Sequence, residues 1–238
     1  MKTLVSGDEI EEVGGSLITE YIGRQRGSVL CTDIEGFIKD YLHHQIEYLE
    51  FAEDDADKIG FLSDGISTLC VFESGKKKTI LLPKGFIVID KRLLSADNSG
   101  KRRFTLAHEA AHVIMTRLCP LYTGPLFKRE FDCEREYNAL QLHERLNIIE
   151  AQVDALASVL LMPRFLVEQA FAKYCSRKSV TQYGEYSFSR SDKLSIQNMA
   201  DSLGVSFCAL LIRLRKLKLI EYRDISEFIS KELVFEGD

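Results

Sequence analysis

The stretch that decides the fold is His108-Glu109-Ala110-Ala111-His112, and Glu150 follows it further along the chain. Residues four apart on a helix lie on one face, so both imidazoles can reach a single ion while Glu109 lies beside them. Zinc in hydrolases usually takes three protein ligands and leaves its fourth position open, and a His, His, Glu set is a recurring combination. We therefore predict one Zn²⁺ ion held by His108, His112 and Glu150.

A second predicted helix, within residues 149–163, carries the acidic side chains. Pro163 ends this helix, and its apolar stripe consists of Ile149, Val153, Leu156 and Leu160. Glu150 and Asp154 share one flank of it, and Asp154 is placed to accept the free N–H of a metal-bound imidazole. The alternative is that both acids are only the solvated side of an amphipathic helix. We disfavour that alternative because the metal site would then lack a third ligand.

The two stretches together resemble the ImmA/IrrE metallopeptidases of bacteria and their mobile elements. The resemblance runs through Arg-Arg-Phe-Thr-Leu-Ala-His-Glu-Ala-Ala-His at 102–112, Glu-Ala-Gln-Val-Asp-Ala-Leu-Ala at 150–157 and Leu-Leu-Met-Pro at 160–163. Two features depart from it: the separation of His112 from Glu150 is long for the family, and Val153 and Leu156 stand where Ala and Phe are common. The resemblance implies a cytoplasmic, zinc-dependent endopeptidase that cleaves a helix-turn-helix repressor and so regulates transcription.

The fold class that we expect is α+β, with a zincin-like metallopeptidase core. The chain has 238 residues, of which 45% are hydrophobic, enough for an ordinary packed core. Strand-like segments at 67–72, 79–82 and 85–90 predict a hairpin and a third strand. We expect them to form a small antiparallel sheet packed on the metal helix, with an edge on which an extended peptide could pair. The expected domains are an N-terminal helix or arm (1–30), the peptidase core (31–165) and a helical C-terminal region (166–238).

Two segments before the metal helix are given no role in catalysis. Residues 33–50 have helical periodicity with Asp33 as a possible cap, and His43 and His44 at its end are interpreted as packed or solvated rather than as ligands. The acidic run at 53–57 is interpreted as an exposed loop, because it lacks the spaced oxygen ligands and the glycine of a calcium loop.

Residues 195–219 resemble a helix-turn-helix, with Gly204 at the turn. The segment holds four cations against one acid, which gives a local charge of +3; these are Arg213, Arg215, Lys216 and Lys218 against Asp201. The second helix could bind DNA or a protein partner, or it could pack its leucine face on the core while the cations face water. The packing alternative is favoured, because Arg213 stands where many such motifs bury an aliphatic side chain and the net charge of −5 attracts no nucleic acid.

The six cysteines and the hydropathy indicate a reducing compartment. The cysteines have no C-x-x-C pair and are interpreted as free thiols, and Cys119 and Cys133 are not needed as ligands beside the His, His, Glu set. No apolar run approaches about 18 residues, and no export signal is visible. We therefore expect a cytoplasmic protein with no membrane partner.

The chemistry that we expect is peptide hydrolysis by zinc-activated water, with Glu109 as the general base that passes the proton to the leaving amine. Donors for the oxyanion are left open among Tyr122, Tyr137 and His143. One competing interpretation is a DNA-binding or adaptor module with a structural metal, but such sites are closed by four ligands rich in cysteine. Another is an exopeptidase, but no group that would clamp a free chain terminus is readable.

Overall fold

The computed structural model describes residues 5–24, 29–119, 127–129, 148–175 and 178–232. Its architecture is α+β, with helices and three small sheets. The chain divides into two compact units, Met1–Pro163 and Arg164–Asp238. Among the described residues, the group that could hold a metal ion belongs to the first unit.

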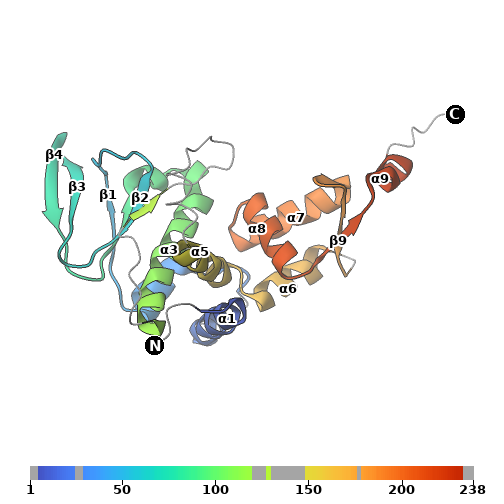
Figure 1. Ribbon diagram of the computed structural model, residues 1–238, viewed down its shortest axis with the longest axis horizontal. Coiled ribbons are helices and arrows are strands. Elements are labelled where there is room, and N and C mark those ends of the chain that lie inside the picture. The colour runs from blue at the N-terminus through green and yellow to red at the C-terminus, as the bar shows by residue number, and fades with distance from the viewer. Residues whose placement is uncertain (1–4, 25–28, 120–126, 130–147, 176–177, 233–238) are drawn as a thin grey trace. The chain divides into compact units, whose positions relative to one another are not determined.

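A four-stranded sheet forms one layer of the first unit (Figure 1). Its strand order is β1-β5-β2-β6, where the strands are β1 (Ile46–Leu49), β5 (Ile87–Asp90), β2 (Lys58–Leu62) and β6 (Phe127–Arg129). β2 runs antiparallel to both of its neighbours, but β1 and β5 pair in parallel. The expected antiparallel sheet is therefore a mixed one. The long connection between β1 and β5 permits this, since parallel neighbours need a crossover.

The predicted hairpin is confirmed, but it forms a sheet of its own. It consists of β3 (Thr68–Glu73) and β4 (Lys76–Leu81), which pair antiparallel. Ser74 and Gly75, the two residues of the turn, have φ angles of 52° and 77°. A two-residue turn with both φ angles positive matches the twist of the strands that it joins. The third predicted strand, β5, belongs to the four-stranded sheet instead.

The helix expected over residues 33–50 is only partly present. Asp33 caps α2 (Ile34–Gly36) by accepting the backbone N–H of Gly36, and a π-helical turn, η1 (Phe37–Tyr41), continues it. The helical structure ends before His43, which has a φ of 60°. The prediction is wrong beyond that point, because residues 46–49 form β1 and pair with β5.

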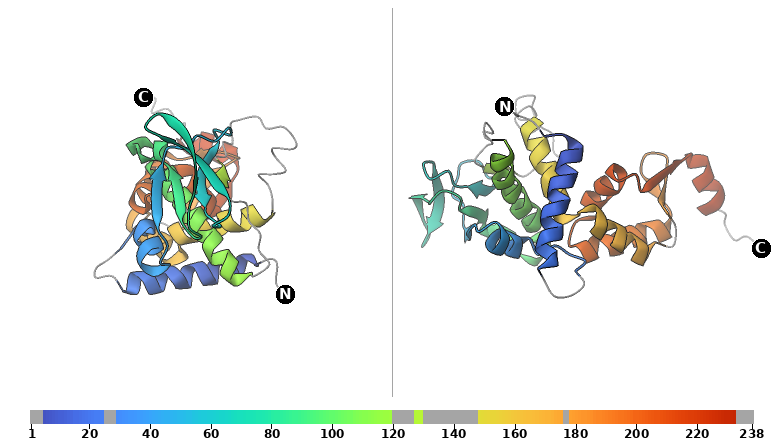
Figure 2. Two further views of the ribbon diagram at one scale, coloured as in Figure 1. Left: turned by 90° about the vertical axis from the view of Figure 1, so that its left-hand side faces the viewer. Right: turned by 90° about the horizontal axis from the view of Figure 1, so that it is seen from below.

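Three long helices follow one another beside the four-stranded sheet, and one of them packs on its strands. They are α1 (Gly7–Gly23), α3 (Ser99–Leu118) and α5 (Ile148–Leu161). Strands β2 and β5 pack on α3, and α5 lies between α3 and α1 (Figures 1 and 2). The short 3₁₀ turns η2 (Lys91–Leu94) and η3 (Ala96–Asn98) lead from β5 into α3. This order places the two helices with metal-ligand sequences side by side.

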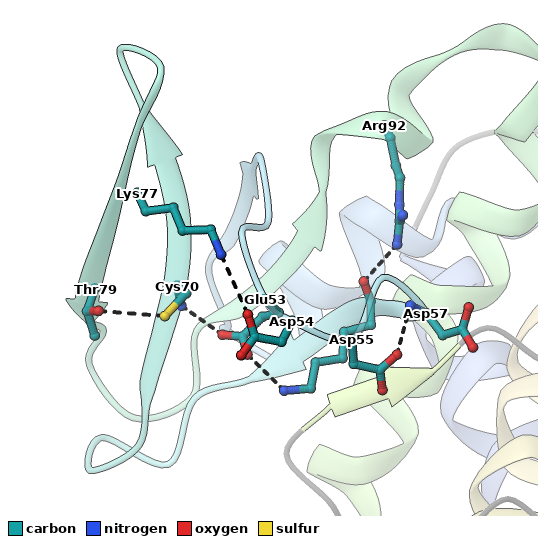
Figure 3. A network of polar contacts seen from close by, with 9 residues as sticks. Glu53, Asp54, Asp55, Asp57, Cys70, Lys77, Thr79 and Arg92 are labelled. Atoms are coloured by element: carbon teal, nitrogen blue, oxygen red, sulfur yellow. Dashed lines mark hydrogen bonds and ion pairs between the residues drawn. The ribbon is translucent and has the colours of Figure 1, made fainter. Parts of the chain in front are cut away.

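The acidic run is less exposed than the sequence suggested. The Glu53 side chain is only 14% exposed and bonds Lys58 Nζ at 2.8 Å. Its other carboxylate oxygen accepts the backbone N–H of Cys70 at 2.8 Å, while Asp54 is fully exposed (Figure 3). Glu53 therefore fastens this loop to β3 of the hairpin, and the prediction of an exposed loop is wrong at that residue.

The second unit is mixed rather than only helical, which corrects the expected helical region. Its strands, in the order β8-β7-β9, are β8 (Ser187–Phe188), β7 (Val180–Tyr183) and β9 (Ile220–Arg223). Its helices are α6 (Arg164–Tyr174), α7 (Arg190–Leu203), α8 (Phe207–Lys216) and α9 (Ile225–Glu232). Gly204, with a φ of 65°, ends α7 as a left-handed cap, and α8 is bent from α7 by 101°.

In the described ranges, no single helix combines the length and the apolar composition that crossing a membrane would require.

Candidate metal centre

The α3 helix presents two buried imidazoles to one point. His108 and His112 are 0% and 2% exposed, and their Nε2 atoms lie 2.9 Å apart. Three alanines of the same helix, at 107, 110 and 111, are fully buried. Their small side chains allow neighbouring elements to approach the helix closely, and they leave room around the histidines.

The α5 helix brings a carboxylate to the same point. Glu150 Oε2 lies 3.3 Å from His108 Nε2, and Glu150 Oε1 lies 3.6 Å from His112 Nε2. The Glu150 side chain is 12% exposed. Within the part of the chain that the structure describes, these three side chains form the group of His, Cys, Asp or Glu residues suited to an ion, with ligand atoms within 4.8 Å of one another.

The spacing of these atoms fits a small tetrahedral cation. Tetrahedral zinc with bonds of about 2.0–2.1 Å separates its ligand atoms by roughly 3.3 Å. The three measured separations, 2.9, 3.3 and 3.6 Å, lie on both sides of that value. Two imidazole nitrogens and one carboxylate are also a donor set that zinc accepts in hydrolases. The residues present therefore fit the ion that the sequence predicts.

Asp154 orients the first imidazole from behind. Its Oδ1 lies 2.7 Å from His108 Nδ1, and its side chain is 44% exposed. A carboxylate at this distance holds the imidazole proton on Nδ1, so the lone pair of Nε2 is left to point at the metal position. The geometry is the one expected of a carboxylate that supports a metal-bound histidine.

Glu109 lies next to the ligands on α3 and is 1% exposed. One residue turns a helix by about 100°, so Glu109 flanks the face that carries His108 and His112. A buried carboxylate beside a pair of candidate metal ligands is of the kind that exchanges protons in metal-assisted hydrolysis.

Of the other candidate ligands in the sequence, those that the structure describes do not join this group. Cys119 is fully buried as a free thiol, and His44 Nδ1 bonds the carbonyl oxygen of Gly85 at 2.8 Å. His43 is exposed. Cys133 lies outside the described residues, as do the three candidate oxyanion donors, Tyr122, Tyr137 and His143.

Fewer of the positively charged side chains in residues 195–219 are exposed to solvent than the sequence suggests. Arg213 is 1% exposed, and the Arg215 guanidinium donates to Gln182 Oε1 at 3.0 Å. Lys216 and Lys218 are exposed. The side chains that give this segment its charge of +3 are therefore not all exposed to solvent. The burial of Arg213 agrees with the interpretation that its position belongs to the packed side of the helix.

The sequence interpretation missed the contribution of the N-terminal helix. Residues 1–30 were expected to form only an N-terminal helix or arm, but α1 packs along α5, which carries Glu150. A signal for this packing was present in the sequence, since the buried residues of α1 recur at helical spacing: Ile10, Gly14, Ile18 and Tyr21.

The chain matches the model of a known protein family. The model of the IrrE N-terminal-like domain, a peptidase family designated M78, matches residues 71–215. The matched range includes α3 and α5. These two helices carry His108, Glu109, His112, Glu150 and Asp154. No curated protein matches the chain.

Proposed function

Because this chain belongs to the M78 family of peptidases with an IrrE N-terminal-like domain, we propose that it is a zinc-dependent endopeptidase. The observation that carries the proposal is the convergence of His108, His112 and Glu150 from two helices. Three protein ligands leave one position for water or substrate, as in catalytic zinc sites, whereas structural sites are usually closed by four.

The proposed chemistry divides between the ion and the protein. A bound zinc ion supplies Lewis acidity, which brings the pKa of water to about 7 and polarises the scissile carbonyl. Glu109 removes a proton from the attacking water and delivers it to the leaving nitrogen. Asp154 keeps His108 in the tautomer that can act as a ligand. General acid–base catalysis of this kind contributes about 10²–10⁴-fold to the rate.

The proposed substrate is a helix-turn-helix repressor in the bacterial cytoplasm. The support is the resemblance of residues 102–112 and 150–163 to the ImmA/IrrE peptidases. The sheet also offers a place for an extended segment of such a substrate, since β6 is at an edge of the strand order and packs on α3. Main-chain hydrogen bonds to an edge strand hold peptides in this way.

The test is cleavage of regulators encoded beside the gene by the zinc-loaded protein. Wild type and the control Glu47→Gln, an exposed glutamate of β1, should yield a shortened repressor. Glu109→Gln should bind zinc like wild type and leave the repressor intact. An intact repressor with wild type, or cleavage by Glu109→Gln at the wild-type rate, would contradict the proposal.

Two further arms separate the competing functions. A peptide spanning the cleaved bond, with an acetylated N-terminus and an amidated C-terminus, should still be cut by an endopeptidase and not by an enzyme that needs a free terminus. If the protein were a DNA-binding module with a structural metal, wild type and Glu109→Gln would both shift duplex DNA and neither would cut the peptide.

A further inference from the structure

The α5 helix has two functional stripes on opposite sides. Glu150 and Asp154 lie four residues apart and both reach the imidazole of His108 on α3. Two residues turn a helix by about 200°, so Gln152 points away from both carboxylates. Gln152, Leu156 and Val159 follow one another at spacings of four and three and form the opposite stripe.

This opposite stripe rests on α1. The Gln152 side-chain amide donates to the backbone carbonyl of Val5, at the N-terminal end of α1. Ser6 and Glu9 form a capping box that fixes this end: Glu9 Oε2 accepts the Ser6 N–H at 2.9 Å, and Ser6 Oγ accepts the Glu9 N–H. The contact with α5 therefore starts from an ordered helix end.

The two helices approach each other closely at Gly14. A Cβ atom placed on Gly14 would lie 2.7 Å from Val159 Cγ1 and 3.0 Å from Leu156 Cδ1. Both side chains are fully buried, so they have little room to move away. Gly15, the next residue of α1, has no neighbour within 4 Å of the corresponding position. Any side chain at Gly14 would therefore push α5 from the side opposite to its carboxylates.

We infer that α1 is the positioning element of the metal centre and that Gly14 is its positioning residue. Because Gly14 has no side chain, α5 can pack close against α1. The position that α5 takes there determines the distances of Glu150 and Asp154 from the imidazoles on α3. The inference rests on the proposed function only in that the ion is zinc. Packed helices transmit such a displacement, because protein interiors are dense and hardly compressible.

The test compares Gly14→Ala with its neighbour Gly15→Ala in the full chain. Zinc affinity is measured by competition with a chelator, well below the unfolding temperature. Gly14→Ala should weaken zinc binding by about tenfold or more, as do changes to groups that orient metal ligands, and Gly15→Ala should leave it unchanged. The visible absorption of the cobalt(II)-loaded protein should change for Gly14→Ala only, because it reports ligand geometry rather than stability.

A second substitution, which makes room for the side chain added by Gly14→Ala, provides a more specific test. Val159→Ala removes the methyl group nearest to the added Cβ, so the double variant Gly14→Ala/Val159→Ala should bind zinc within about threefold of Val159→Ala alone. Equal zinc affinity and cobalt spectra for Gly14→Ala and Gly15→Ala would overturn the inference. So would a Gly14→Ala defect that Val159→Ala leaves unchanged.

A second variant covers the case in which Gly14→Ala does not fold. Gln152→Met keeps the side-chain length but loses the donor to Val5, and it should weaken zinc binding several-fold; unchanged affinity would count against the inference. The proposed function fails separately, since wild type itself would then bind no zinc or would bind it without cleaving any peptide.

Discussion

Asp154 Oδ1 and His108 Nδ1 lie 2.7 Å apart, although the two residues are 46 positions apart in the chain. The carboxylate belongs to α5 and the imidazole to α3, so this contact joins the two helices that carry the proposed ligands. The same bond fixes the tautomer of the ligand. One contact therefore both joins α5 to α3 and orients the His108 imidazole for a metal ion.

Asp154→Asn should weaken zinc binding by about 10–100-fold, because the neutral amide accepts the imidazole proton less strongly. The side chain is 44% exposed, so the free energy of unfolding of the metal-free protein should change by less than about 1 kcal/mol. Chelator competition and denaturant unfolding measure the two effects. Unchanged zinc affinity would show that the contact does not support the ligand.

Zinc should stabilise the folded protein, because His108, His112 and Glu150 come together only in the folded state. At a free zinc concentration of 100 times the Kd, linkage adds about 2.7 kcal/mol to the free energy of unfolding. Scanning calorimetry should show the unfolding temperature of wild type rising with zinc and falling with a chelator. For His112→Ala, which lacks one ligand, the zinc-dependent rise should largely disappear. A rise of equal size in both proteins would place the stabilising ion elsewhere.

The cations of the second unit should differ sharply in their effect on stability. Arg213→Ala should lower the free energy of unfolding by about 2 kcal/mol or more, because the large side chain is 1% exposed and its removal leaves a cavity. Lys216→Ala, at an exposed position of the same helix, should change it by no more than about 0.5 kcal/mol. Denaturant unfolding of both variants checks this. Equal effects would mean that Arg213 has no structural role in α8.

Asp90 should make stability depend on pH. Burial raises the pKa of its carboxyl above the ordinary value, and the backbone N–H of Arg92, at 2.9 Å, opposes the shift. The folded protein therefore binds the proton more tightly than the unfolded chain does. Asp90 thus lowers stability as the pH rises from about 3.9, the unfolded pKa, through the higher folded value.

Asp90→Asn removes this titration and keeps an oxygen that can accept the Arg92 N–H. The free energy of unfolding of wild type, relative to that of the variant, should fall as the pH rises from below about 3.9, the unfolded pKa, through the higher folded value. Urea titrations at several pH values measure the difference. A constant difference, or one that rises with pH, would contradict the assigned direction of the pKa shift.

Helix periodicity predicted the elements of the metal centre because its determinants are local. The spacing of His108 and His112 needs only one helix, and Pro163 lies two residues beyond the end of α5 at Leu161. The family match agrees with the resemblance drawn from these same stretches. The position of Glu150 beside the two histidines was inferred from the number of ligands that zinc needs, and not from helical periodicity.

The elements that the sequence did not predict depend on distant partners. β1 exists through pairing with β5, some 40 residues away, and the end of η1 depends on a left-handed backbone at His43 where no glycine marks it. The parallel sense of that pair could not be read from apolar alternation. Likewise, Gly14 shows its role only when the side chains of α5 are known.

The strand order β1-β5-β2-β6 has a practical consequence. β1 and β2 flank β5 on either side, yet both precede residue 71, where the recognisable family similarity starts. A recombinant fragment trimmed to 71–215 would strip both hydrogen-bonding partners from β5, and with them the N-terminal helix behind α5. The segment that matches the family model is thus shorter than the unit in which β5 and α5 have all their packing partners.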